Sequence, residues 1–177
     1  MNVYILRHAS AGKGKPNSAQ DDKRPLDKEG IEQCGNVGRL LAALNVQVDA
    51  VISSPLKRAV QTASLVANEL GHERQIVFSE ALGPNATLGG FREMLAKYAQ
   101  QEDILVVGHN PSLSQFLSSM ITGGANENAI DLKKGAVALV DYDSRTGTEL
   151  IWSITPKIAR AVYELTAARS RPKTSRK

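Results

Sequence analysis

The order of hydrophobic and polar positions along the chain follows two periods. Short runs of β-branched and aromatic residues bounded by polar residues are typical of buried strands, whereas apolar residues that recur every three or four positions are typical of helices. These patterns predict strands at residues 2–6, 50–52, 75–78 and 104–107, helices at 27–44, 55–70, 91–99, 111–122 and 157–168, and loops at 9–25 and 80–90.

Several helix boundaries are marked by residues that satisfy free backbone groups at helix ends. Asp27 is placed to cap the first helix, and Gly123 is placed to end the fourth. A serine before Pro55, and Asn110 before Pro111, predict in the same way a cap followed by proline at the first helical position.

The last two apolar runs, at residues 136–142 and 149–154, flank turn-forming residues and predict a β-hairpin at one side of the sheet. Strands and helices alternate in the rest of the chain, which favours parallel strands joined by helices. The sequence therefore predicts one α/β domain over residues 1–168, a three-layer α/β/α sandwich with a central, mainly parallel mixed sheet.

The composition narrows the class of protein. With 177 residues, of which 42% are hydrophobic and 23% charged, the chain has the proportions of one soluble globular domain. Cys34 is the only cysteine, which excludes an intrachain disulfide and a four-cysteine metal site. The longest apolar runs have five residues, far fewer than the roughly 20 that cross a bilayer. Because residues 1–7 also do not resemble a secretory signal, we expect a cytoplasmic protein without a membrane partner.

The net charge of +4 is concentrated at the end of the chain. Residues 169–177 contain five basic residues and no acidic one, which leaves 17 basic and 18 acidic residues in 1–168. A basic chain often binds a polyanion, but the body of this one is nearly neutral. We therefore expect no nucleic-acid partner and interpret residues 169–177 as a disordered basic tail.

Polar residues suited to chemistry follow three of the predicted strands. Arg7 and His8 end the first strand, Arg58 lies in the first turn of the helix after the second, and His109 follows the fourth. Each residue alone would ordinarily be a hydrogen-bonding loop residue or a solvated helix residue. Because ligands of open α/β sheets bind at the carboxyl ends of strands, the coincidence of all four predicts one shared site.

Two guanidinium groups and two imidazoles favour a compact dianion over a cation. Arginine presents a rigid fork of donors that fits phosphoryl oxygens, and nearby helix N-termini add positive potential. A neighbouring guanidinium also lowers the pKa of a histidine, which keeps the imidazole neutral and nucleophilic. The residues therefore indicate phosphoryl chemistry without a metal or cofactor.

Three segments resemble the signature segments of a known family. LRHASAG at residues 6–12, SSPLKRAVQTA at 53–63 and VVGHNP at 106–111 are similar to those of the histidine phosphatase superfamily. The short chain, RPLDKEG at 24–30 and WSITP at 152–156 resemble its SixA-like phosphohistidine phosphatase branch.

The resemblance implies a role for each site residue. His8 matches the nucleophile that becomes a transient phosphohistidine, Arg7 and Arg58 match the arginines that bind the phosphoryl oxygens, and His109 matches the second histidine, which donates to the transferring group. Arg24 matches a further arginine near the site in this branch. The superfamily usually has glycine after the nucleophile, where this chain has Ala9, a change that is tolerated if the backbone there is not left-handed.

The resemblance leaves the substrate open. The segment from 79 to 103 offers little material for a lid, and an open site suits phosphohistidine on a partner protein, with inorganic phosphate as product. An alternative is a small-molecule phosphomonoesterase in which Glu80 is the general acid, although Glu80 is equally consistent with a surface loop residue. A third possibility is a non-catalytic module that binds phosphorylated partners, against which the presence of Arg7, His8, Arg58 and His109 argues.

Overall fold

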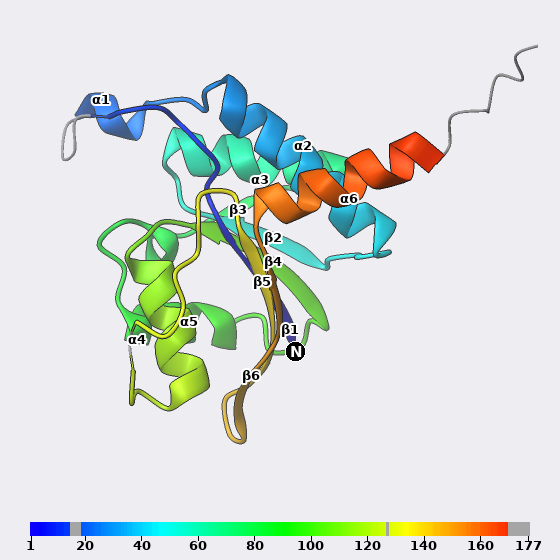
Figure 1. Ribbon diagram of the computed structural model, residues 1–177. Coiled ribbons are helices and arrows are strands. Elements are labelled where there is room, and N and C mark those ends of the chain that lie inside the picture. Colours follow the sequence, from blue (N-terminus) through cyan, green and yellow to red (C-terminus); the bar gives the residue numbers. More distant parts are fainter. Residues whose placement is uncertain (15–18, 127, 170–177) are drawn as a thin grey trace, which may run out of the picture.

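A six-stranded mixed sheet forms the centre of the computed structural model, which describes residues 1–14, 19–126 and 128–169 (Figure 1). The strand order is β3-β2-β4-β1-β5-β6. β1 pairs in parallel with β4, β4 with β2 and β2 with β3, whereas β5 is antiparallel to β1 and to β6. The strands are β1 (Asn2–Arg7), β2 (Ala50–Ser53), β3 (Val77–Phe78), β4 (Asp103–Gly108), β5 (Val137–Asp143) and β6 (Gly147–Ile154).

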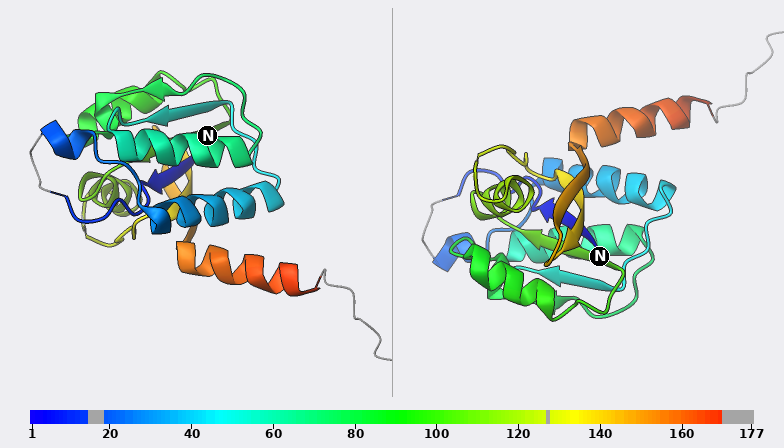
Figure 2. Two further views of the ribbon diagram at one scale, coloured as in Figure 1. Left: turned by 90° about the horizontal axis from the view of Figure 1, so that it is seen from above. Right: turned by 90° about the horizontal axis from the view of Figure 1, so that it is seen from below.

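Helices cover both faces of this sheet, as the views from above and below show (Figure 2). One face carries α2 (Lys28–Ala43), α3 (Lys57–Glu69) and α6 (Pro156–Arg169), and the other carries α4 (Leu88–Ala96) and α5 (Ser112–Thr122). Two short elements, α1 (Ala19–Asp22) and the 3-10 helix η1 (Glu80–Leu82), lie in connections. The predicted three-layer α/β/α sandwich with its mainly parallel sheet and terminal hairpin is confirmed.

Alternation along β1 divides the apolar interior into two cores. Val3 and Ile5 face the core beneath α4 and α5, whereas Tyr4 and Leu6 face the core beneath α2 and α3. Successive side chains of a strand point to opposite faces, so a strand buried on both sides reads as a continuous apolar run. This burial fixes β1 at the centre of the sheet. The carboxyl end of β1 therefore lies in the middle of the sheet edge at which the parallel strands end.

Two of the predicted helix boundaries are confirmed by their hydrogen bonds. The Asp27 side chain accepts a hydrogen bond from the Gly30 amide and caps α2. Gly123 ends α5 in the left-handed conformation, with φ of 61°, a backbone angle that glycine adopts without a steric penalty.

The helix after β2 begins later than the sequence pattern predicts, at Lys57 rather than at Pro55. Ser54 therefore does not cap a helix. Its Oγ accepts a hydrogen bond from the Leu56 amide (3.3 Å) and lies 2.9 Å from Nε2 of His109. The hydroxyl that looked like a capping group belongs instead to the histidine cluster.

Asn110 is a second residue whose predicted capping role is wrong. α5 begins at Ser112, and the Asn110 amide group donates from Nδ2 to the carbonyl oxygen of Leu132 (3.0 Å). Here too a polar side chain next to the site bridges two loops rather than closing a helix end.

Other differences are smaller and involve elements that have little periodicity. The predicted loop at 9–25 contains the four-residue helix α1, and of the predicted strand at 75–78 only the last two residues pair with β2. α6 ends at Arg169, and residues 170–177, most of the predicted basic tail, lie outside the described residues. Within the described part of the chain, every helix is too short or too polar to cross a membrane.

Candidate active site

The two histidines lie side by side where the two central parallel strands end. Arg7 of β1 is in register with Gly108 of β4, so the next residues, His8 and His109, occupy equivalent positions on neighbouring strands. The His8 amide donates to the Gly108 carbonyl (3.0 Å), and the ring centroids are 4.9 Å apart. The structure thus brings together two residues that the sequence separates by about a hundred positions.

The hydrogen bonds of His8 determine which ring nitrogen is free. Nδ1 lies 2.8 Å from the carbonyl oxygen of Ala9. A carbonyl oxygen only accepts hydrogen bonds, so in the neutral ring the proton is on Nδ1 and the lone pair is on Nε2. His8 is also 93% buried, with 7% of its surface exposed. The ring is therefore held in one orientation, with the lone pair of Nε2 free to attack an electrophile.

His109 is held by the hydroxyl of Ser54. Nε2 of His109 lies 2.9 Å from Ser54 Oγ, and Nδ1 is buried without a hydrogen-bond partner among the described residues. If the hydroxyl donates to Nε2, the ring proton is on Nδ1 and is available to an oxygen of a bound group. Buried polar atoms are nearly always hydrogen-bonded, and those that are not often have a function.

Burial is the main reason that both histidines are neutral at pH 7. Desolvation above all, together with the charges of Arg58, Arg7 and Arg24, lowers the pKa of His8 to about 3. Desolvation likewise lowers the pKa of His109 to about 2, helped by the neighbouring His8 and the same three arginines. A neutral imidazole keeps a lone pair for attack, which a protonated ring does not have.

We expect these lowered pKa values to make the fold sensitive to mild acid. In the unfolded chain each histidine binds a proton near pH 6.5, whereas in the fold both stay neutral well below it. The contribution of the two neutral histidines to the free energy of unfolding is therefore fully present above pH 6.5. It is lost as the pH falls toward their pKa values in the folded protein. Between pH 7 and pH 5 the free energy of unfolding should drop by about 2 kcal/mol for each histidine.

Urea unfolding at pH 7 and pH 5 measures this loss. Carboxyl groups change little in this window, so the two histidines should dominate it. The double variant His8→Asn and His109→Asn should lose much less free energy over the same interval. An equal loss in the double variant would contradict the assignment.

Arg58 and Arg7 lie beside the histidines, Arg58 buried and Arg7 half-buried. Arg58, whose side chain is 6% exposed, donates from Nη1 to the backbone carbonyl of Asp21 (2.8 Å) and pairs with its carboxylate (3.2 Å). Arg7 donates from Nη1 to the carbonyl of Leu132 (2.7 Å). In both arginines Nε is buried without a partner among the described residues. Each therefore has a fixed orientation and an unused donor.

Arg24 joins this cluster through a residue that the sequence analysis did not select. Asp21 of α1 accepts from Arg24 Nε (2.8 Å) and also pairs with Arg58, so one carboxylate holds two arginines. Arg24 also donates to the carbonyl of Ala11 (2.6 Å). The available signal was an acid three residues before Arg24, but in a predicted loop it resembled any solvated aspartate.

Removing the Asp21 carboxylate should slow phosphoryl transfer at this site, because Arg24 and Arg58 are then no longer held in place. We expect Asp21→Ala to lower kcat about tenfold, because misplaced donors no longer match a developing charge. Asp21→Asn should restore part of the activity, since its amide oxygen still accepts from Arg24. Steady-state kinetics with p-nitrophenyl phosphate measures both variants. Asp22→Ala, an exposed neighbouring acid, is the control and should leave kcat unchanged. Unchanged kcat in Asp21→Ala would contradict the positioning role.

Known proteins share this arrangement of sequence segments. Residues 3–83 match the model of the histidine phosphatase superfamily, branch 1. A protein of uncharacterised function from Picosynechococcus is 30% identical over 164 residues, which cover 89% of this chain and 98% of that one. The chain belongs to the histidine phosphatase superfamily.

The similarity extends to a named member of this superfamily. The phosphohistidine phosphatase SixA of Escherichia coli is 26% identical over 171 residues, covering 92% of this chain and all of that protein. A solved structure of the protein histidine phosphatase SixA with tungstate superposes with a TM-score of 0.77 over 89% of this chain and 98% of that chain, at 24% identity. The sheet and its helices are thus those of a SixA-type histidine phosphatase fold.

Ala9, where the superfamily usually has glycine, fits without strain. Among the described residues other than glycine, only Asn45 has a positive φ, so the backbone at Ala9 is not left-handed. The Ala9 side chain is fully buried, and its amide donates to Oγ1 of Thr62 (3.1 Å). The extra methyl group therefore packs in the core beneath α3 rather than into the site.

Glu80 lies apart from the hydrogen-bond network of the histidines. It begins η1 with an exposed side chain, and no hydrogen bond or ion pair joins it to Arg7, His8, Arg58 or His109. The described residues also contain no group of three or more histidine, cysteine, aspartate or glutamate side chains placed to hold a metal ion. What the site offers to a ligand is a nucleophile and cationic donors, a combination suited to an oxyanion.

Proposed function

We propose that this protein is a phosphatase that removes the phosphoryl group from phosphohistidine on a partner protein through a covalent intermediate on His8. The observation that carries the proposal is the pair of neutral, buried imidazoles 4.9 Å apart, beside the buried guanidinium group of Arg58 and the half-buried one of Arg7. The similarity to SixA supports the same reaction class.

In the first step, Nε2 of His8 attacks the phosphorus atom. A bond forms between Nε2 and phosphorus while the bond from phosphorus to the substrate's imidazole nitrogen breaks. That nitrogen leaves with the bonding electron pair and takes up a proton from solvent water. Arg7 and Arg58 bind the phosphoryl oxygens, and His109 donates from Nδ1 to one of them. Such donors lower the barrier because charge on the transferring group is stabilised by groups already in place.

In the second step, water attacks phosphorus on the opposite side of the new bond. The bond to Nε2 breaks and its electron pair returns to His8, which becomes neutral again. One proton of the water stays on the inorganic phosphate, and the other is released to solvent. The Ala9 carbonyl accepts from Nδ1 throughout, so the imidazole keeps its orientation in both steps. Each half-reaction thus uses the same residues in the same positions.

The short connection between β3 and β4 supports a protein substrate. Between Phe78 and Asp103 the chain forms only η1, α4 and short turns, so it contributes no long segment to cover the histidines. A site that this connection leaves uncovered admits a side chain presented on a large surface, whereas catalysis on small substrates commonly relies on closure.

A comparison of substrates tests the proposal. A peptide phosphorylated on histidine would be offered alongside a panel of small phosphomonoesters, and kcat/KM measured for each. We expect the phosphohistidine peptide to have the highest value. A large preference for a small phosphomonoester would contradict the proposed substrate.

The exposed position of Glu80 leads to a prediction about the leaving group. An imidazole leaves more readily than an alkoxide and needs less help from an acid. We therefore expect Glu80→Gln to change kcat/KM for a phosphohistidine peptide by less than about threefold. Loss of alkyl phosphate turnover alone would mark Glu80 as a general acid for esters, whereas an equal loss for both substrates would contradict the prediction.

A further inference from the structure

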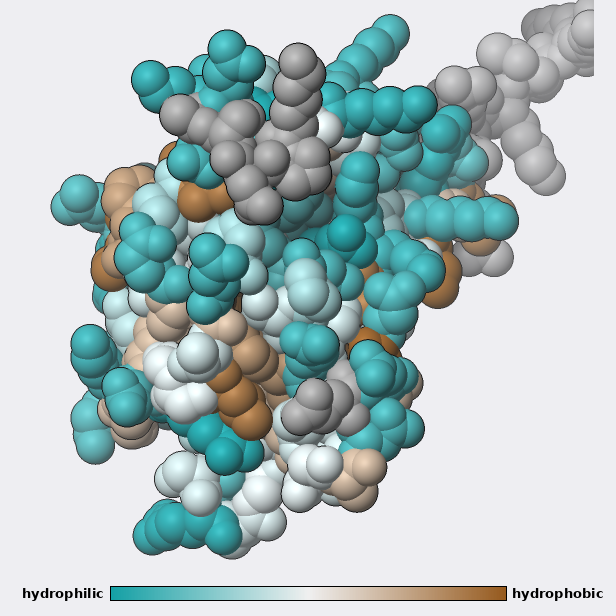
Figure 3. All heavy atoms as spheres, turned by 90° about the vertical axis from the view of Figure 1, so that its left-hand side faces the viewer, coloured by the Kyte–Doolittle hydropathy of each residue, from teal (hydrophilic) through white to brown (hydrophobic). Residues whose placement is uncertain are grey.

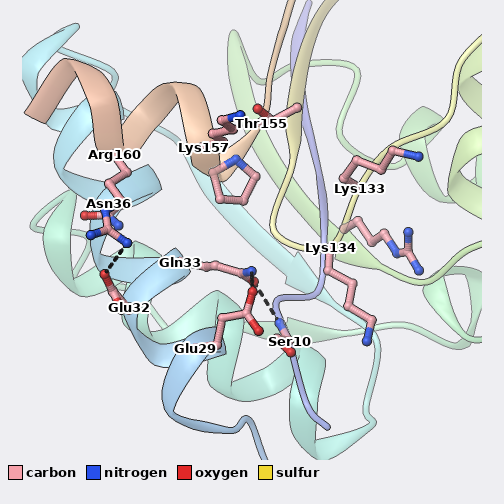
Figure 4. Close-up of a pocket in the computed structure, with 12 residues that line it drawn as sticks. Ser10, Glu29, Glu32, Gln33, Asn36, Lys133, Lys134, Thr155, Lys157 and Arg160 are labelled. Carbon is pink, nitrogen blue, oxygen red and sulfur yellow. Dashed lines mark hydrogen bonds and ion pairs between the residues drawn. The ribbon is translucent and has the colours of Figure 1, made fainter. Parts of the chain in front are cut away.

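A charged groove runs from the candidate active site toward α6. It is a cavity of about 730 Å³ between α2, α6 and the loop before β5 (Figure 4). Arg7 and Ser10 line its inner end, and Lys157 and Arg160 of α6 line its outer end. We call it the α2–α6 groove. Arg7 therefore belongs to two neighbouring sites, the one that contains His8 and this one.

The end of the groove near Arg7 is held in a fixed shape. Gln33 of α2 accepts from the Ser10 amide (2.9 Å), which joins the helix to the segment just after His8 (Figure 4). The loop on the other side is tied to Arg7 through the Leu132 carbonyl (2.7 Å). Both walls of the groove are thus held in place beside the segment that carries Arg7 and His8.

The lining of the groove has an excess of positive charge. Five basic residues and two acidic ones contribute to it. Lys133 is paired with Asp131, and Arg160 is paired with Glu32 (3.4 Å). Lys134 and Lys157 are exposed, and neither forms an ion pair with any carboxylate of the described residues. Two ammonium groups therefore face solvent beside the cationic site that contains Arg7.

The opposite sign is confined to the α2 wall. Glu29 accepts from Nε2 of Gln33 (3.0 Å) and has no basic partner within ion-pair distance among the described residues. Lys133 and Lys134 lie across the groove from it (Figure 4). The α2 wall thus carries negative charge and the opposite wall carries positive charge. This arrangement favours an occupant whose negative charges face Lys133 and Lys134.

We propose that the α2–α6 groove binds an acidic segment of the phosphorylated partner protein, with Lys134 and Lys157 as its principal contacts. This inference rests on the proposed phosphohistidine phosphatase function. The groove adjoins the phosphoryl site through Arg7, and it is much larger than a phosphoryl group needs, so it accommodates several residues of a chain. The face seen in Figure 3 is hydrophilic along its upper part and its rim, and a hydrophobic strip crosses its lower centre.

Two synthetic peptides test the inference. Both carry one phosphohistidine, one with aspartate and glutamate residues around it and the other with serine and glutamine at the same positions. At low salt we expect kcat/KM for the acidic peptide to exceed that for the neutral peptide about tenfold, an advantage that salt should reduce. The double variant Lys134→Glu and Lys157→Glu should abolish the advantage.

A matched control separates groove contacts from net charge. Arg145 is exposed at the β5–β6 turn, at the opposite end of the sheet from His8, so Arg145→Glu should leave the ratio between the two peptides unchanged. Equal turnover of both peptides by the wild type, or a ratio that survives the double variant, would overturn the groove assignment while the proposed function stands.

Two further outcomes concern the substrate itself. If neither phosphohistidine peptide is hydrolysed while p-nitrophenyl phosphate is, the proposed function fails, whatever the groove binds. A small phosphate ester that also carries a carboxylate gives the last test. If its kcat/KM depends on Lys134 and Lys157 in the same way, the groove recognises a small anion, and the proposal of an acidic protein segment is overturned.

Discussion

Replacing His8 by asparagine is expected to reduce kcat by roughly four orders of magnitude or more, because no other group at the site forms the covalent intermediate. Asparagine removes the nucleophilic lone pair and keeps a polar side chain that is able to hydrogen-bond to the Ala9 carbonyl. The variant should therefore fold, and the loss should lie in the chemical step rather than in KM.

The covalent intermediate gives a second measurement of the same prediction. After brief exposure to a substrate labelled with radioactive phosphorus, the wild-type protein should carry an acid-labile label, and His8→Asn should carry none. His72→Asn is the matched control, since His72 bonds to the Val48 carbonyl (3.1 Å) away from the His8 cluster, and it should keep the label. A labelled His8→Asn would place the nucleophile elsewhere, and an unlabelled, inactive wild type would favour a non-catalytic binding module.

Replacing Arg58 by alanine should have the next largest effect, lowering kcat/KM by about a thousandfold. Arg58 is buried beside both histidines, and its charge contributes to the lowered pKa of each. Its removal takes away a donor for the phosphoryl oxygens and leaves the Asp21 carboxylate with one arginine fewer. The negative charges of the phosphoryl oxygens and of Asp21 would then have less positive charge close to them, which raises the barrier to phosphoryl transfer.

Arg58→Lys should recover only a small part of this loss. An ammonium group supplies charge but not the planar fork that holds the Asp21 oxygens and a ligand at once. Steady-state kinetics with a phosphohistidine peptide compares the two variants, and Lys57→Ala, an exposed neighbour on α3, is the control. Comparable activity of Arg58→Lys and wild type would show that charge alone suffices and that the proposed geometry is incorrect.

The sequence predicted those parts of the molecule that depend on long apolar runs and on strand ends. A short, fully apolar run such as 104–107 predicts a buried strand. Once the strands that precede His8 and His109 are parallel and adjacent, the two histidines must lie side by side. The predicted convergence of these histidines with Arg58 is therefore a consequence of topology, and the structure places all three together.

The details that sequence reasoning missed depend on pairing across the fold. α1 has four residues, too few to show a period, and the contact of Asp21 with Arg58 exists only after the chain has folded back against α3. The residue types of Ser54 and Asn110 predict helix caps, because serine and asparagine suit that role in any sequence. Nothing local distinguishes a capping hydroxyl from one that holds His109.

The distance between the two histidine rings, 4.9 Å, is close to the roughly 4.8 Å that separates neighbouring strands in any β-sheet. The spacing of the two backbones that carry the pair is thus inherited from hydrogen bonds between β1 and β4, and the Ala9 carbonyl and the Ser54 hydroxyl then orient the two rings. Insertions and replacements elsewhere in the surrounding connections should alter which molecules reach the pair while leaving its separation intact. The reaction and the choice of substrate are in this sense separately encoded, the first in the sheet and the second in the loops and helices around it.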